Sequence, residues 1–220
     1  MKLILGTVQF GMDYAGNKQI NKKEIFKILE YAYKNKIKIL DTAYAYGNSE
    51  ELISNFGDKF KIITKGNVLN LNNSLKRLKR KKIYGYLIHD FGYFLHNELI
   101  WYRLKQFKKK GKIEKIGFSL YTLKEIKYLL SRNIKFDIIQ VPYNIYNKKI
   151  SKIFPLLKEK GIEIHVRSIF ARGDLLEKKS IEKCFEFIIK NKYIDKIVIG
   201  INCLEHLKEN IEIYNKLGGD

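Results

Sequence analysis

The stretch Leu40-Asp41-Thr42-Ala43-Tyr44-Ala45-Tyr46-Gly47-Asn48-Ser49-Glu50 decides the fold. It follows the apolar run 37–40, which is typical of a buried strand, and leads into residues 48–51, Asn-Ser-Glu-Glu, which are typical of a helix start. The strand therefore delivers Asp41 at its carboxyl end, and Tyr46 lies in the following loop. In parallel α/β proteins, side chains at strand ends and in the next loops build the functional site. The stretch thus predicts both a parallel sheet and the place of its site.

The same alternation of strand and helix patterns continues along the chain. Eight apolar runs predict strands at 2–10, 37–42, 60–64, 84–88, 113–120, 136–141, 162–170 and 196–201. Eight helical patterns are expected at 21–35, 49–56, 72–81, 98–110, 123–131, 148–160, 181–191 and 204–217. Right-handed crossovers repeated eight times predict an α/β fold of one domain over 1–220, a compact (β/α)₈ TIM barrel. An open doubly wound sheet is the alternative, but no G-x-G-x-x-G follows the first strand.

Composition narrows the class of protein. No apolar run reaches the roughly 18 residues that a membrane span needs, and residues 1–6 open directly into a strand pattern rather than a signal peptide. Two cysteines without spaced partners predict a reduced, cytoplasmic, metal-free protein. The formal charge of +20 allows a nucleic-acid partner, but the lysines scatter over most expected helices, so nucleic acid is not the favoured partner.

Four polar side chains fall at corresponding points of successive units. Asp41 and Tyr46 follow the second strand, Lys65 the third and His89 the fourth, so a closed barrel would bring them to one mouth. The Lys65 ammonium would stabilise a phenolate and lower the pKa of Tyr46, and Asp41 would hold Lys65 by an ion pair. His89 would donate a hydrogen bond to a substrate oxygen. The set predicts a site in which Tyr46 gives a proton to that oxygen.

The segment 41–50 resembles the D-T-A-x-x-Y-G-x-S-E signature of the aldo-keto reductases, and the contexts of Lys65 and His89 are similar to that family's lysine and histidine strands. The resemblance implies a nicotinamide-dependent carbonyl reductase that converts an aldehyde or ketone, such as a sugar derivative, into an alcohol. It implies that Asp41, Tyr46, Lys65 and His89 form the catalytic set. The cofactor implied is NADP, with NAD as the alternative, and the partner implied is a small carbonyl or alcohol substrate.

The resemblance also implies where the cofactor binds. Ser119 and Gln140 match contacts to the nicotinamide carboxamide, Arg167 stands where a tyrosine usually stacks on the nicotinamide, and Ser168 and the loop 171–173 would face the diphosphate. Gly200, Asn202 and Asn210, in the last unit, match the adenosine-phosphate site, where the final helix would offer free amides to phosphate. Aromatic and apolar side chains expected to line the mouth favour the apolar face of a sugar or small cyclic ketone; they are Phe10, Met12, Tyr14, Tyr44, Phe91, Tyr121 and Tyr143.

Several positions depart from the family's pattern. Leu120 replaces an asparagine beside Ser119, Arg167 replaces the stacking tyrosine, and Asn202 stands where NADP-preferring members often carry a basic residue. The seventh unit, between 173 and 197, is short, and the family's N-terminal hairpin is lacking. These departures favour an alternative function, a degenerate barrel that binds a nicotinamide nucleotide as a sensor or partner protein without efficient turnover.

Overall fold

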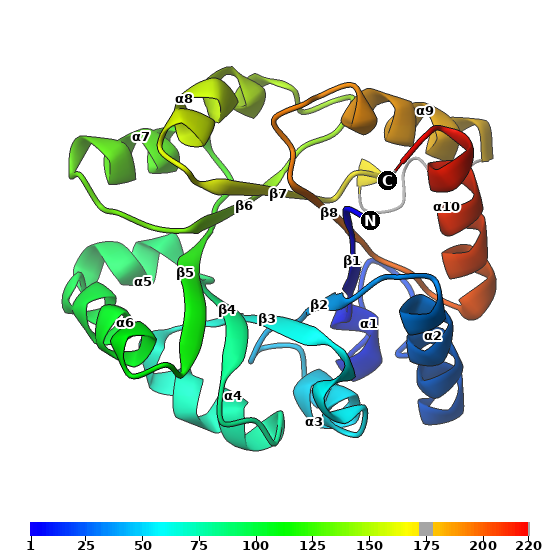
Figure 1. Cartoon of the computed structure of the whole chain (residues 1–220), viewed down its shortest axis with the longest axis horizontal. Coiled ribbons are helices and arrows are strands. Elements are labelled where there is room, and N and C mark those ends of the chain that lie inside the picture. Colours follow the sequence, from blue (N-terminus) through cyan, green and yellow to red (C-terminus); the bar gives the residue numbers. More distant parts are fainter. Residues whose placement is uncertain (172–177, 220) are drawn as a thin grey trace.

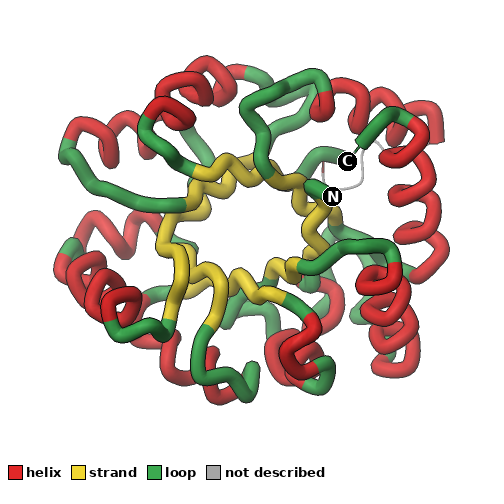
Figure 2. The backbone as a smooth tube through the Cα atoms, in the orientation of Figure 1, coloured by secondary structure: helices red, strands yellow, loops and turns green. Residues whose placement is uncertain are grey.

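Eight parallel strands form a closed barrel inside a ring of helices (Figure 1). The structure, a computed structural model, describes residues 1–171 and 178–219. Each strand pairs with the next, and β1 closes the barrel on β8 through Leu3 opposite Ile197 and Ile4 opposite Val198. Figure 2 shows the strands as the inner ring and the helices outside it. The expected α/β barrel is confirmed.

The strands are β1 Leu3–Gly6, β2 Ile39–Asp41, β3 Lys61–Gly66, β4 Ile83–Ile88, β5 Ile113–Ser119, β6 Ile138–Pro142, β7 Glu163–Arg167 and β8 Lys196–Ile199. The described α-helices are α1 Val8–Gly11, α2 Lys22–Lys34, α3 Ser49–Ser54, α4 Leu71–Arg77, α5 Phe91–His96, α6 Leu99–Lys109, α7 Leu123–Ser131, α8 Phe154–Glu159, α9 Lys178–Ile189 and α10 Leu204–Lys216. Short 3₁₀ helices are η1 Gly57–Lys59, η2 Val68–Asn70 and η3 Lys149–Ile153. Within the described part of the chain, no helix has the length and apolarity to cross a lipid bilayer.

Apolar side chains form two layers, because alternate residues of a strand point to opposite faces. The larger layer lies between the strands and the helices, and the smaller one fills the barrel interior. The interior layer consists of Ile4, Ile39, Ile63, Leu87, Ile138 and Val198. The barrel below the site is therefore a packed core rather than a channel, as is usual for this architecture.

The first and seventh strands end well before the residues that the sequence predicts. The first is predicted to extend to residue 10, but it ends at Gly6 and is followed by α1, which lies against the loop 41–50 at Gly11. The seventh was expected to extend to residue 170, but it ends at Arg167. Ser168 has a φ of 55°, in the left-handed region, which no extended strand can continue through.

Helical segments also differ from the expectation. The helix expected at 148–160 is divided into η3 and α8, with Pro155 in the first turn of α8, because proline lacks the N–H that an unbroken helix requires. The helix α5 was not expected. It begins at the side chain of Asp90, which accepts a hydrogen bond from the Tyr93 amide at 3.0 Å, and it buries Phe94.

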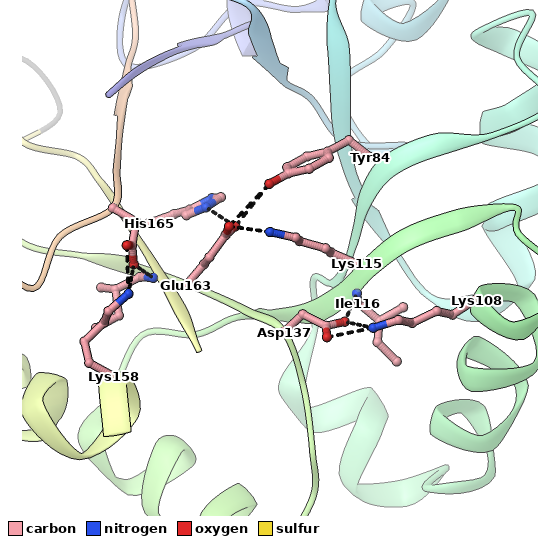
Figure 3. A network of polar contacts seen from close by, with 10 residues as sticks. Tyr84, Lys108, Lys115, Ile116, Asp137, Lys158, Glu163 and His165 are labelled. Atoms are coloured by element: carbon pink, nitrogen blue, oxygen red, sulfur yellow. Dashed lines mark hydrogen bonds and ion pairs between the residues drawn. The ribbon is translucent and has the colours of Figure 1, made fainter. Parts of the chain in front are cut away.

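Two aspartates at the amino ends of strands tie neighbouring units together in the same way. Asp137 accepts hydrogen bonds from the Lys108 ammonium at 2.6 and 2.7 Å and from the Ile116 amide at 2.8 Å (Figure 3). Asp195 accepts two from the Lys158 ammonium at 2.8 Å and one from the Ile164 amide at 2.8 Å. Each aspartate thereby joins the end of a helix to the adjacent strand.

A further polar cluster lies at the amino ends of the strands, opposite the predicted site. Figure 3 shows Glu163 between Tyr84, Lys115 and His165, and Lys115 and Glu163 form an ion pair. We call these four residues the lower cluster. Burial works against ionisation of Glu163, but hydrogen bonds from His165 and Lys115 outweigh it and lower the pKa of Glu163 to about 2.

Candidate active site

The loop 41–50 is fixed by backbone contacts to the neighbouring strand and to α1. The amides of Thr42 and Tyr44 donate to the carbonyls of Ile63 and Lys65 at 2.9 and 2.8 Å. The backbones of Gly11 and the loop approach so closely that a Cβ at Gly11 would lie 1.8 Å from the Tyr46 carbonyl oxygen. Only glycine permits that approach, so α1 determines where Tyr46 stands.

The Asp41 carboxylate and the Lys65 ammonium form a buried ion pair at the ends of β2 and β3. Lys65 Nζ lies 2.5 Å from Asp41 Oδ2 and donates a second hydrogen bond to the Thr42 carbonyl at 2.9 Å. Gln140 Nε2 donates to the other Asp41 oxygen, Oδ1, at 2.7 Å. Lys65 and Asp41 are 1% and 4% exposed, so the orientation of the ammonium is fixed by these contacts rather than by solvent.

The Tyr46 ring lies close to both Lys65 and His89. Lys65 Nζ is 5.2 Å from the centre of the ring, and the His89 ring is 5.9 Å away, in an edge-on arrangement. Burial raises the pKa of Tyr46 above its ordinary value, and the Lys65 ammonium lowers it by less. Lys65 therefore acts on the pKa of Tyr46 in the expected direction, but desolvation of the phenolate is the larger influence, so the net shift is upward.

The His89 side chain is kept neutral. Burial, and then the Lys65 charge, lower the pKa of His89 to about 4. A neutral imidazole keeps one N–H donor and one acceptor nitrogen. At neutral pH, His89 is therefore suited to donating a hydrogen bond rather than supplying a charge.

A cavity of about 330 Å³ opens at this end of the barrel and has all four of these side chains on its wall. Five of the seven expected cofactor residues line it as well: Arg167, Ser168, Gly200, Asn202 and Asn210. Ser119 and Gln140 are buried beside the cavity rather than on its wall. Of the mouth residues expected, Tyr14 and Tyr121 line the cavity, whereas Phe10 and Tyr143 are in the core and Tyr44 packs on Arg77.

Ser119 and Gln140 each keep one polar atom without a partner among the described residues. These atoms, Ser119 Oγ and Gln140 Oε1, are fully buried, although buried polar atoms normally have a hydrogen-bond partner. A hydroxyl that can donate and an amide oxygen that accepts complement the two ends of a carboxamide. The Leu120 side chain lies in the outer apolar layer, so it takes no part in this site.

The amino end of α10 differs from the expectation of free amides. The Leu204 amide donates to the Glu24 carboxylate at 3.0 Å, so one amide is already occupied, and by a negative group. The Asn202 side chain accepts a hydrogen bond from Gln9. Arg172 and Gly173, expected to face a diphosphate, lie outside the described residues.

The sequence interpretation missed Gln9 and Glu209, which also line the cavity. Gln9 lies on α1, which was expected to be strand, so the altered element changed the direction in which its side chain points. The sequence could have indicated Glu209, because it directly precedes the predicted site residue Asn210 on the same helix.

Comparisons with known proteins agree with this arrangement. The model of the aldo/keto reductase family matches residues 2–217, and no curated protein matches. Two structures of a "putative aldo-keto reductase" from Pseudomonas aeruginosa superpose with TM-scores of 0.86 and 0.84, at 22% and 23% identity, each match covering 98% of this chain and 90% of the other. The holo form of the aldo-keto reductase AKR11C1 from Bacillus halodurans superposes with a TM-score of 0.81 at 19% identity, over 96% and 86%. With a barrel that brings Asp41, Tyr46, Lys65 and His89 to one cavity, and a family match along nearly its whole length, the chain belongs to the aldo/keto reductase family.

Proposed function

We propose that this protein is an NAD(P)H-dependent carbonyl reductase that converts a small aldehyde or ketone into an alcohol. The observation that carries the proposal is the meeting of Asp41, Tyr46, Lys65 and His89 at one cavity. Family members are typically NAD(P)H-dependent oxidoreductases, which agrees with this chemistry. The cavity of about 330 Å³ is of a size that favours a small aldehyde or ketone as substrate.

The raised pKa of Tyr46 keeps its hydroxyl protonated at neutral pH, so the donor form is the resident one. The proton leaves when negative charge develops on the substrate oxygen, and the Lys65 ammonium then stabilises the phenolate through the short distance to the ring. Asp41, held by Gln140, keeps Lys65 in place. His89 donates its N–H to the same oxygen and orients the carbonyl.

Ser119 and Gln140, which lie beside the cavity, offer the unpaired donor and acceptor that a nicotinamide carboxamide requires, and a reduced nicotinamide would supply the hydride when bound. Arg167, Ser168, Gly200, Asn202 and Asn210 all line this cavity, and we assign the last three to the adenosine part of the cofactor. We expect NADPH, which the family usually uses, with NADH as the alternative. The Glu24 carboxylate at the amino end of α10 would repel the additional phosphate of NADPH. We therefore expect the affinities for NADPH and NADH to differ little.

The experiment is a comparison of Tyr46→Phe with the wild type. We expect the oxidation of NADPH or NADH with a panel of aldehydes to fall at least about 100-fold, the usual contribution of general acid catalysis. The dissociation constant for the cofactor, measured by nicotinamide fluorescence, stays within about twofold, because the ring remains. Tyr102→Phe, on the exposed face of α6, is the matched control and keeps both values. Full turnover in Tyr46→Phe would remove Tyr46 as the proton donor.

A second candidate, nucleotide binding without efficient turnover, is favoured by the raised pKa of Tyr46, which makes the phenol a weaker proton donor. Tight cofactor binding by the wild type with no turnover across the aldehyde panel would support it against the reductase.

A further inference from the structure

Arg167 is the last residue of β7 and points into the cavity. Ile164 and Val166 belong to the outer apolar layer, and alternation along the strand places Arg167 on the inner face. It lines the cavity together with Tyr46 and His89. Its charge is also among the influences on the pKa of both of these side chains, so the guanidinium stands close to the predicted reaction centre.

The guanidinium has weak partners within the described part of the chain. One nitrogen donates to the Leu120 carbonyl at 3.4 Å, and Cζ lies 4.3 Å from the centre of the Tyr121 ring. Neither group is an anion, and a guanidinium has five N–H donors. Three other arginines, by contrast, have a carboxylate as partner. Arg77, Arg80 and Arg132 each lie within 4 Å of a carboxylate.

The charges around the reaction centre therefore do not balance. The Lys65 charge is compensated by Asp41, and His89 is neutral above a pKa of about 4. The remaining carboxylate on the cavity wall, Glu209, is carried by α10, and it forms no ion pair with Arg167 among the described residues. Among the residues that the structure describes, the Arg167 charge therefore has no counterion, and a guanidinium is a group that can bind a carboxylate bidentately.

We infer that Arg167 binds an anionic group of the substrate, so that the substrate is a small aldehyde or ketone with a carboxylate or phosphate near its carbonyl. This inference rests on the proposed function and specifies its substrate. Tyr121 supports one face of the guanidinium, which leaves its N–H edge for the anion. The formal charge of +20 would draw such substrates toward the protein.

The test compares anionic substrates with neutral ones of similar size. The probes are 4-oxobutanoate against butanal, and 4-carboxybenzaldehyde against benzaldehyde, each with saturating NADPH and with NADH. We expect kcat/KM to favour the anion by about 10- to 100-fold, the range for a charge-assisted bidentate pair. Arg167→Gln abolishes this preference, because kcat/KM falls more for the anionic aldehydes than for their neutral counterparts. Arg167→Lys restores part of it, and Arg103→Gln, at an exposed position on α6, is the charge-matched control that leaves it unchanged.

Three results would overturn the inference. Equal kcat/KM for anionic and neutral aldehydes would show that Arg167 does not select the substrate, while the reductase activity would stand. A rise in the cofactor dissociation constant in Arg167→Gln, with equal losses for both substrate classes, would assign Arg167 to the cofactor diphosphate. Retention of the preference in Arg167→Gln would assign it to another cation. Absence of turnover with every aldehyde, by contrast, is failure of the proposed reductase function.

Discussion

Asp41 accepts hydrogen bonds on both carboxylate oxygens, from Lys65 on one side and from Gln140, 99 positions along the chain, on the other. Removal of one partner of such a buried pair leaves an uncompensated charge, which typically costs about 3–5 kcal/mol. The bond from Gln140 therefore bears on the position of Lys65, although Gln140 itself lies beside the cavity and not on its wall.

The lowered pKa of His89 predicts a pH dependence of stability. The unfolded chain, with a pKa of 6.5 for this group, takes up a proton before the folded one, whose pKa is about 4. Stability is therefore lost as the pH falls from about 6.5 to about 4, by about 1–3 kcal/mol. Urea unfolding at about pH 4.5 and about pH 7.5 measures this loss.

The control for that measurement is His89→Gln, which does not titrate. We expect the variant to lose less stability than the wild type between the two pH values. Equal losses would show that the imidazole takes up its proton as readily in the folded protein as in the unfolded one.

At the scale of single residues, the sequence was sufficient where chain order determines position. Asp41, Tyr46, Lys65 and His89 each follow a strand, so the closed barrel brings them together. It was insufficient for the pKa of Tyr46, whose direction depends on how deeply the ring is buried. The bond between Gln140 and Asp41 also depends on contacts across the barrel that no local pattern encodes.

At the scale of elements, the contact between α1 and the loop 41–50 predicts the effect of a methyl group. Gly11→Ala places a Cβ 1.8 Å from the Tyr46 carbonyl oxygen and 2.6 Å from the Ser49 amide. Because both atoms belong to the backbone, the loop must move. We expect a loss of about 1–3 kcal/mol in stability, measured by urea unfolding, together with a fall in kcat.

Gly92→Ala, on α5, is the matched control, because its Cβ would meet only a side-chain oxygen of Asp90, at 3.2 Å. That variant keeps both stability and activity. If Gly11→Ala behaved like it, α1 would not determine the place of Tyr46.

The elements themselves were predictable where hydrophobic periodicity is strong, as it is for α2 and α10. The departures arose where one residue overrides the pattern. Ser168, with its positive φ, ends β7 although apolar residues continue beyond it, and Pro155 divides a segment whose pattern is helical throughout. Asp90 before Phe91 was a usable capping signal for α5, but a six-residue helix gives too little periodicity to support it.

At the scale of the whole molecule, the aspartates at the amino ends of the strands should act on stability alone. Asp137→Asn removes the charge that Lys108 and the Ile116 amide share. We expect a loss of about 1–3 kcal/mol in the free energy of unfolding, with kcat/KM within about twofold of the wild type, because the site lies at the opposite end of the barrel.

Asp58→Asn is the control, since the Asp58 side chain, which pairs with Arg80, is itself 94% exposed to solvent. For Asp58→Asn we expect the free energy of unfolding to change by less than about 0.5 kcal/mol. An equal effect of the two substitutions would mean that the tie between α6 and β5 contributes no more than a surface pair.

The strand β7 carries Glu163, His165 and Arg167 on its inner face, from the lower cluster to the cavity, with Ile164 and Val166 between them on the outer face. Side-chain direction in a strand depends on whether a position is odd or even. Deleting a single residue before Glu163 would therefore turn every side chain of the strand to the opposite face. The three ionisable side chains would then lie in the outer apolar layer, and the two aliphatic ones would face the barrel interior. The contacts of the lower cluster and the Arg167 charge at the cavity therefore depend on the same strand register. A change in the length of this segment would disrupt both.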